Sequence, residues 1–249
     1  MQARVRVLDR FLAMAGRTIS ANSTLKARRP PLDARGVSRA IAILRREAPK
    51  WYAPIVSFIA THDRDPFRTL ISCILSLRTK DETTAPAAHR LFSCANTPGE
   101  ILALEPKALE RLIYPVGFYR TKAQVIRGIS RDLIDKFGGR VPDEIDALLT
   151  LKGVGRKTAN LVVTEAFGKP GICVDTHVHR ISNRWGFVRT KTPEKTEAAL
   201  RRVLPRRHWI EYNGLLVAFG QTICHPTSPW CSRCPVEPMC PKIGVKRSR

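Results

Sequence analysis

Apolar residues recur along most of the chain at the spacing of one face of an α-helix. One such face is formed by Leu70, Ile71, Ile74 and Leu75. A second face runs over three turns and is formed by Ile126, Ile129, Leu133, Ile134 and Phe137. Strict alternation of apolar and polar residues, which is typical of a half-buried strand, is almost missing from the sequence. The pattern therefore predicts an all-α fold.

Turn-forming residues divide the helical segments. Asp65-Pro66 and Thr97-Pro98 each combine a side chain that caps a helix start with a proline that fits the first turn. Phe137-Gly138-Gly139 predicts the end of the second apolar face, because glycine readily adopts the left-handed conformation that closes many helices. Arg29-Pro30-Pro31 closes a basic N-terminal segment. We therefore expect many short helices whose ends are encoded locally.

The composition makes this helical chain strongly basic. Its 249 residues, 43% of them apolar, can bury the core of one large domain or of two small ones. The 43 Lys and Arg residues outnumber the 21 Asp and Glu residues and give a net charge of +22. Residues 1–36 carry +6 of this charge and residues 242–249 carry +4, which leaves +12 on the part between them. A basic body favours a polyanionic partner such as nucleic acid, and no apolar run approaches the ~18 residues that cross a bilayer.

Seven cysteines fall into two classes. Four are close together in the spacing C-x6-C-x2-C-x5-C, namely Cys224, Cys231, Cys234 and Cys240. Thiolates at this density indicate a soft metal centre, and the spacing alone leaves both zinc and iron–sulfur open. Cys73, Cys94 and Cys173 stand singly in apolar surroundings and are predicted to be small core residues. This usage favours an intracellular, reducing compartment, although the Arg-rich N-terminal segment would also suit an organelle address.

Two glycines mark a tight connection between amphipathic segments. Gly153 and Gly155 lie within the run Leu151 to Asn160, where they permit a positive φ and the close approach of another backbone. Amides at the start of the second helix can hold a phosphate, so the run predicts a helix-hairpin-helix turn that binds the DNA backbone. Lys152 and Arg156 flank this turn as candidate phosphate contacts. A plain helix–helix turn is the alternative.

Lys157 and Asp175 are the candidate catalytic residues. The helix dipole and the adjacent Arg156 disfavour an ammonium at Lys157, which makes a neutral, nucleophilic amine more available. A simple phosphate contact is the alternative for this lysine. Asp175 stands at a predicted helix start, where it is either a partner carboxylate or a helix cap. His177 is expected to be a structural, hydrogen-bonding histidine.

The run from Leu148 to Trp185, together with the cysteine spacing, closely resembles the endonuclease III family of DNA glycosylases. The resemblance extends from about residue 37 to residue 240. It implies a 4Fe-4S cluster on the four clustered cysteines and DNA bound across a cleft between two helical domains. The implied domains are a six-helix barrel of residues 59–169, with the hairpin, and a cluster domain of residues 37–58 and 170–249. Residues 1–36 would be a basic, disordered arm.

The resemblance also implies a mechanism. The amine of Lys157 would attack C1′ of a damaged nucleotide, release the base and form a Schiff base that undergoes β-elimination. Asp175 would stabilise the positive charge that develops on the sugar. The nucleotide must leave the stack, so Phe118 in the loop Val116–Tyr119 would act as a wedge and Arg78 would fill the vacated space. The implied substrate is duplex DNA with oxidised pyrimidines or abasic sites, bound by a monomer.

Two departures and two alternatives accompany this resemblance. Many relatives carry glutamine at the position of Arg78, so the preference for the opposite base is open. Lys152 replaces a proline that is common in the hairpin. One alternative is a mismatch-specific or other-base glycosylase of the same superfamily, although those relatives generally lack a lysine at position 157. The other is a non-catalytic, redox-sensing DNA-binding protein, which would need neither Lys157 nor Asp175.

Overall fold

The computed structural model describes residues 29–51, 56–57, 59–60 and 65–249. Every regular element in this described part is helical, so the all-α prediction is confirmed. The α-helices are α2 (Ala34–Glu47), α4 (Pro66–Ser76), α5 (Asp81–Phe92), α6 (Pro98–Ala103), α7 (Pro106–Ile113), α8 (Tyr119–Phe137), α9 (Ile145–Leu149), α10 (Arg156–Phe167), α11 (Thr176–Arg184), α12 (Pro193–Val203) and α13 (Trp209–Thr222). Short 3-10 helices are η1 (Ala48–Lys50), η2 (Arg206–His208), η3 (Cys231–Arg233) and η4 (Glu237–Met239).

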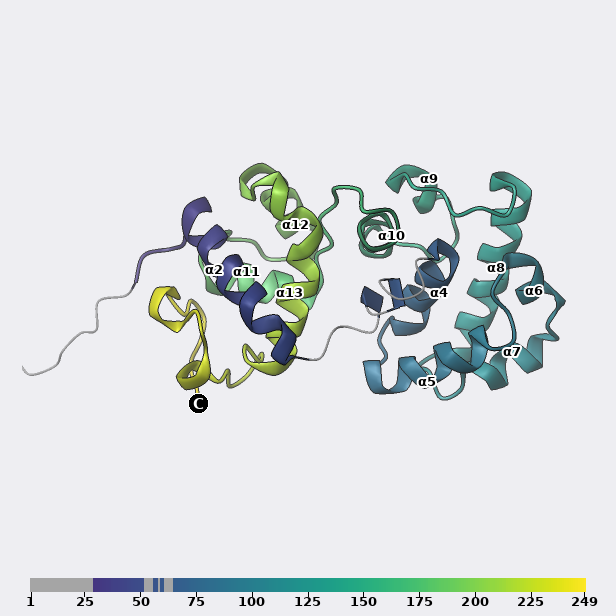
Figure 1. Cartoon of the computed structure of the whole chain (residues 1–249), viewed down its shortest axis with the longest axis horizontal. Coiled ribbons are helices and arrows are strands. Elements are labelled where there is room, and N and C mark those ends of the chain that lie inside the picture. The colour runs from purple at the N-terminus through teal and green to yellow at the C-terminus, as the bar shows by residue number, and fades with distance from the viewer. Residues whose placement is uncertain (1–28, 52–55, 58, 61–64) are drawn as a thin grey trace, which may run out of the picture.

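The helices form two groups, each around its own apolar core. Helices α4 to α10 gather on one side of the molecule, and α2 and α11 to α13 gather on the other with the C-terminal segment (Figure 1). The first core draws its buried residues from 56–173, and the second draws them from 37–44 and 172–236. The second group therefore joins the beginning and the end of the described chain.

Helix α4 is the centre of the first group. Its predicted apolar face is confirmed, because Leu70, Ile71, Ile74 and Leu75 are all buried. The predicted face of α8 is only partly correct. Ile126, Ile129 and Leu133 are fully buried, whereas Ile134 is 42% exposed. Ile134 follows Leu133 directly and so lies about 100° further around the helix, beyond the edge of the buried face.

Local signals set several helix ends. Asp65 Oδ1 accepts hydrogen bonds from the backbone N–H groups of Phe67 (2.7 Å) and Arg68 (3.1 Å) and so caps α4. Thr97 caps α6 and forms a reciprocal capping box with Glu100. Gly138 closes α8 with a φ of 59°. The two helix starts and the one helix end predicted from these residues are confirmed. Such ends can be predicted from sequence because each depends on residues only a few positions apart.

Polar contacts hold the ends of the chain in the second group. The N–H of Leu32 donates to the carbonyl of Trp185 (2.9 Å), and Arg29 forms an ion pair with Glu237 (3.1 Å). Helix α2 begins at Ala34, inside the range predicted as a basic arm. Residues 1–28 of that range lie outside the described residues.

The isolated cysteines do not all behave as predicted. Cys73 and Cys173 are buried in the first core, and burial raises the pKa of Cys73 to about 12, so they are inert core residues. The prediction is wrong for Cys94, which is exposed. It lies beyond the last turn of α5, in the connection to α6, where no element covers it. Within the described ranges, no helix is both long and apolar enough to span a membrane.

Candidate functional site

The predicted hairpin connects α9 to α10. Gly153 has a φ of 90°, and a Cβ atom at this position would lie 2.6 Å from Cγ1 of Val125 on α8. Only glycine satisfies both the left-handed backbone and this close approach. Gly155 is the N-cap of α10, and within the described part of the chain no atom other than those of its two chain neighbours lies within 4 Å of where its Cβ would be. The first glycine therefore packs the hairpin on α8, while the second leaves the start of α10 open to a ligand.

A cavity of about 530 Å³ brings the two candidate catalytic residues together. Lys157 enters it from the first turn of α10, and Asp175 enters it from the residue that precedes α11. The walls come from both groups of helices. Among the other lining residues are Ser57, Ser76, Leu77, Arg78, Thr79, Asp81, Leu161, His177, Glu194, Asn213, Val217 and Gln221. Most residues of this wall carry no sequence pattern that predicts their place in a site.

Asp175 is a helix cap as well as a cavity residue. Its Oδ1 accepts hydrogen bonds from the backbone N–H groups of His177 (2.8 Å) and Val178 (2.9 Å) at the start of α11. Both bonds go to the same oxygen, so they fix the orientation of the carboxyl group. The cap and the partner carboxylate are thus two compatible roles for one side chain.

His177 has a structural partner although it lines the cavity. Nη2 of Arg180 lies 3.0 Å from its Nδ1, and the ring packs against Gly220, where a Cβ would lie only 2.4 Å from Nδ1. Burial lowers the pKa of His177, against the opposing effect of the Asp175 carboxylate. The prediction of a hydrogen-bonding histidine is confirmed.

Arg78 lines the cavity, and Phe118 lies beside Arg78. The guanidinium carbon of Arg78 is 4.8 Å from the centroid of the Phe118 ring, a cation–π contact. The two residues have φ values of 53° and 58°, and a left-handed conformation costs about 1–3 kcal/mol for a residue other than glycine. Phe118 is 61% exposed. The aromatic ring and the cation are thus held together by two residues with strained backbones.

Lys122 is a further residue of this region that the sequence patterns did not single out. Its ammonium contacts Leu77 and Thr79, the neighbours of Arg78 in the chain. Lys122 is 7% exposed, and its ammonium donates to the carbonyls of Leu75 (2.7 Å) and Leu77 (2.6 Å) and to the Thr79 hydroxyl (3.0 Å). Burial lowers the pKa of Lys122 to about 8. The available signal was its position four residues before Ile126, on the predicted buried face of α8.

Arg156 is held by a carboxylate of the other group of helices. Its Nε lies 3.1 Å from both carboxylate oxygens of Glu197 on α12, whose side chain is 8% exposed. Arg201 Nε donates to the same carboxylate at 2.9 Å. Arg156 therefore links α10 to α12, in addition to its predicted contact with DNA. Lys152, by contrast, is exposed in the hairpin.

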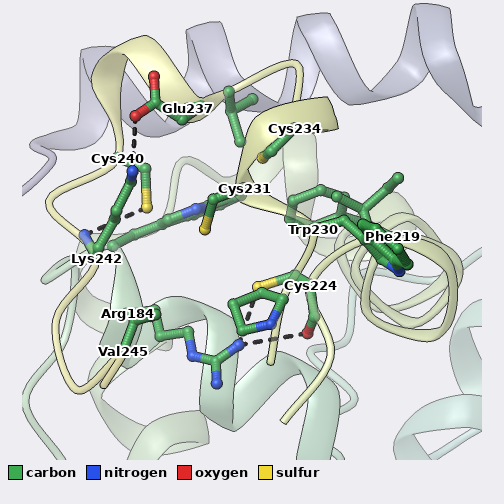
Figure 2. Close-up of a pocket in the computed structure, with 14 residues that line it drawn as sticks. Arg184, Phe219, Cys224, Trp230, Cys231, Cys234, Glu237, Cys240, Lys242 and Val245 are labelled. Carbon is green, nitrogen blue, oxygen red and sulfur yellow. Dashed lines mark hydrogen bonds and ion pairs between the residues drawn. The ribbon is translucent and has the colours of Figure 1, made fainter. Parts of the chain in front are cut away.

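The four clustered cysteines line a single pocket, shown in Figure 2. Cys224 follows α13, and the other three lie in and around η3 and η4. Cys224 Sγ accepts a hydrogen bond from Arg184 Nη1 (3.2 Å), and Cys240 Sγ accepts one from the backbone N–H of Lys242 (3.4 Å).

Burial disfavours negative charge on two of the clustered thiols, those of Cys234 and Cys240. Burial raises the pKa of Cys234 to about 12 and that of Cys240 to about 11, and the neighbouring cysteines act in the same direction. Within the described ranges, no three His, Cys, Asp or Glu side chains are placed to hold one metal ion. Four thiols that line one pocket are soft ligands, and a cationic group bound there would neutralise the thiolates.

The chain is similar in sequence to known DNA repair proteins. A sequence profile described as HhH-GPD superfamily base excision DNA repair protein matches residues 71–206. Endonuclease III of Thermotoga maritima is 52% identical over 178 residues, which cover 72% of this chain and 84% of that protein. Endonuclease III-like protein 1 of Bos taurus is 43% identical over 200 residues, covering 76% of this chain and 66% of that protein.

A solved structure shares the same fold. The trapped covalent intermediate of endonuclease III with DNA, in its estranged-adenine complex, has a TM-score of 0.75 and 36% identity. The match covers 84% of this chain and 96% of that one. The resemblance predicted from the hairpin and the cysteine spacing is therefore confirmed, and with it the class of DNA glycosylase with lyase activity. The chain belongs to the endonuclease III family of HhH-GPD base excision DNA repair proteins.

Proposed function

We propose that the cavity is the active site of a bifunctional glycosylase and lyase, in which Lys157 is the nucleophile and Asp175 is its partner carboxylate. The observation that supports this most is that both residues line one cavity although they come from opposite groups of helices. A phosphate contact alone would need neither a cavity of this size nor the carboxylate. The proposed substrate is duplex DNA that contains an oxidised pyrimidine or an abasic site.

The reaction begins when the neutral amine of Lys157 attacks C1′ of the damaged nucleotide. The C1′–N bond to the base breaks as the new C–N bond forms, and the base leaves with a proton. The C1′–O4′ bond then breaks, O4′ takes up a proton, and the nitrogen lone pair forms the C1′=N bond of a protonated Schiff base. Loss of a proton from C2′ forms a C2′=C3′ double bond as the C3′–O bond to the phosphate breaks, and water adds at C1′ to release the lysine. Lys157 is the residue that forms and breaks a covalent bond in this scheme.

Asp175 acts on charge that appears during base release. Its carboxylate stabilises the positive charge that develops on the sugar, and the cap at the start of α11 keeps it oriented. A preoriented group costs no reorganisation when the charge appears. The cap thus contributes to catalysis through position.

DNA would lie across the hairpin and the rim of the cavity. The open start of α10 and the exposed Lys152 suit phosphates of the backbone. Phe118 would enter the stack when the damaged nucleotide leaves it, and Arg78 would face the orphaned base. Their contact in the free protein supports this joint role.

A 4Fe-4S cluster on Cys224, Cys231, Cys234 and Cys240 is the proposed cofactor, rather than zinc. Membership of the endonuclease III family supports it, together with the four thiols that line one pocket. The two N–H···S hydrogen bonds are of the kind that tunes iron–sulfur clusters. When bound, the cluster would cross-link residues 224–240 and hold them against α11 and α13.

The two apolar cores support a division into two domains. The proposed barrel domain is residues 59–169, and its core also takes in Val56 and Cys173 just outside these boundaries. The cluster domain would comprise residues 37–58 and 170–249. The protein would work as a monomer in a compartment that holds DNA, either the interior of a bacterial cell or an organelle or nucleus.

The test is borohydride trapping of the protein on duplex DNA with a single lesion. Wild type should give a covalent product and cut the strand. Lys157→Gln should give neither, while DNA affinity changes little because the hairpin glycines are untouched. A Lys157→Gln protein that still traps would overturn the nucleophile assignment. Running the assay over a panel of lesions separates oxidised pyrimidines from mismatches and other bases.

A further inference from the structure

The turns that carry Arg78 and Phe118 meet at the buried ammonium of Lys122. This lysine lies in the first turn of α8, and its three N–H donors are matched by three acceptors: Leu75 O, Leu77 O and Thr79 Oγ1. With all three bonds made, the side chain has little freedom. It therefore fixes the end of α4 against the start of α8.

The placement of this charge is unfavourable for α8 and favourable for α4. A cation in the first turn of a helix lies at the positive end of its dipole. Leu75 and Leu77, however, present the last carbonyls of α4, which form the negative end of that helix. A methionine would fill the same buried space without desolvating a charge. Holding these carbonyls is thus the feature that distinguishes a lysine at this position.

Thr79 extends the contact to the second turn. Its hydroxyl accepts from Lys122 Nζ and also from the backbone N–H of Gly117 (3.2 Å). Thr79 directly follows Arg78, and Gly117 directly precedes Phe118. A Cβ on Gly117 would lie 3.1 Å from the carbonyl of Arg78, so the two backbones nearly touch. One ammonium and one hydroxyl thus join the two residues with strained, left-handed backbones.

We infer that Lys122 is a positioning residue for base extrusion, because it clamps the two turns so that Arg78 and Phe118 enter the duplex as one rigid unit. The inference rests on the roles proposed above for these two side chains. Lys122 acts from beneath the turns and takes no part in bond breaking. Its loss should therefore affect the extrusion of a paired base more than the chemistry at a site that has no base.

The experiment compares Lys122→Met with Lys136→Met. Methionine keeps the apolar volume of Lys122 and removes its three hydrogen bonds, whereas Lys136 is a 53% exposed lysine near the other end of the same helix. Each protein is assayed for base release from a paired lesion and for cleavage at a preformed abasic site. A 2-aminopurine base beside the lesion reports unstacking by its fluorescence.

Lys122→Met should slow base release roughly tenfold or more and reduce the 2-aminopurine signal, while abasic-site cleavage falls less than about threefold. Lys136→Met should match wild type in every assay. Equal losses by Lys122→Met on the two substrates would indicate a merely structural role and would overturn the inference.

A double-mutant cycle tests whether Lys122 acts through the wedge. In a Phe118→Ala background, Lys122→Met should add less than about twofold to the loss of base release, because its target is already gone. Independent, additive losses would overturn the inference. If Phe118→Ala itself left base release unchanged, the proposed wedge role would fail first and the inference would fall with it. If Phe118→Ala slowed base release and Lys122→Met did not, the inference would be refuted while the proposed wedge role of Phe118 would stand.

A second variant covers the case in which Lys122→Met does not fold. Thr79→Val removes the hydroxyl that joins the two turns but leaves the bonds from Lys122 to the α4 carbonyls. It should show the same selective loss on the paired lesion, with a smaller magnitude and a near-normal melting temperature. Normal base release by Thr79→Val would then decide against the clamp.

Discussion

The proposed active-site cavity and the thiol pocket differ in how their residues are distributed along the chain. The cavity takes its walls from segments between residues 56 and 221, which belong to both groups of helices. The sulfur atoms of the thiol pocket come from residues 224–240 alone, although Arg184, Trp185 and Phe219 close it. One site is assembled by the packing of two groups, and the other is nearly complete within one short segment.

The two sites therefore depend on different parts of the fold. Lys157 and Asp175 meet only if the two groups keep their relative position, and the ion pair of Arg156 with Glu197 is one of the contacts that bridge α10 and α12. The thiol pocket needs only the second group to fold. Damage to the pocket should therefore act on folding and DNA affinity, whereas damage to the cavity should act on rate.

The largest effect is expected from a substitution in the thiol pocket. Cys231→Ser removes one of four ligands, so the protein should lose iron and its brown colour. The free energy of unfolding should fall by at least about 3 kcal/mol, because metal binding is coupled to folding. Iron analysis, denaturant unfolding and DNA affinity measure the three losses. Cys94→Ser, which changes an exposed cysteine, is the matched control and should have no effect.

The same variant also tests whether pocket and cavity are separable. The trapping rate is measured with enough Cys231→Ser protein to bind all of the DNA. Under this condition the rate should stay within about threefold of wild type, because none of the clustered cysteines lines the cavity. A wild-type protein that binds stoichiometric zinc and no iron would refute the proposed cluster. A collapse of the trapping rate at saturation would show instead that the two sites depend on each other.

The next effect concerns the cavity alone. Asp175→Asn should lower the rate of base release roughly a hundredfold, because the lost charge acts mainly in the transition state. Asparagine caps a helix about as well as aspartate, so the melting temperature should hardly move. Single-turnover kinetics and a thermal melt measure the two effects separately. A wild-type rate in Asp175→Asn would leave the cap as the only role of this residue.

The features that the sequence made predictable are those encoded by near neighbours. Asp65 and Thr97 cap helices through atoms two or three residues away, and the hairpin needs little beyond its glycines. Exposure is different, because Ile134 and Cys94 depend on which other elements cover them. Lys122 shows the limit most clearly. Two of its three acceptors are backbone carbonyls 45 and 47 residues away, and they become its partners only when α4 packs against α8.

A smaller effect is expected when the ion pair between Arg156 and Glu197, which links the two groups of helices, is removed. Glu197→Gln leaves the guanidinium groups of Arg156 and Arg201 opposite a neutral amide in a largely buried place. The free energy of unfolding should fall by about 2 kcal/mol, and base release should slow about fivefold because α10 carries Lys157. Urea denaturation and single-turnover kinetics measure these effects. Glu110→Gln, which breaks the pair of Glu110 with the exposed Lys107 on α7, should change neither. A normal rate in Glu197→Gln would show that the cavity does not need this bridge.

The smallest effect tests the hairpin as a DNA contact outside both sites. Lys152 is exposed and is not one of the residues that line the cavity, so Lys152→Ala should alter only binding. Loss of one phosphate contact makes the slope of log affinity against log salt less steep by about 0.9. Lys107→Ala, on the surface of α7, is the matched control and should keep the wild-type slope. Arg156→Ala should change the slope less than Lys152→Ala, because Glu197 already neutralises much of its charge. An unchanged slope in Lys152→Ala would place its ammonium away from the DNA backbone.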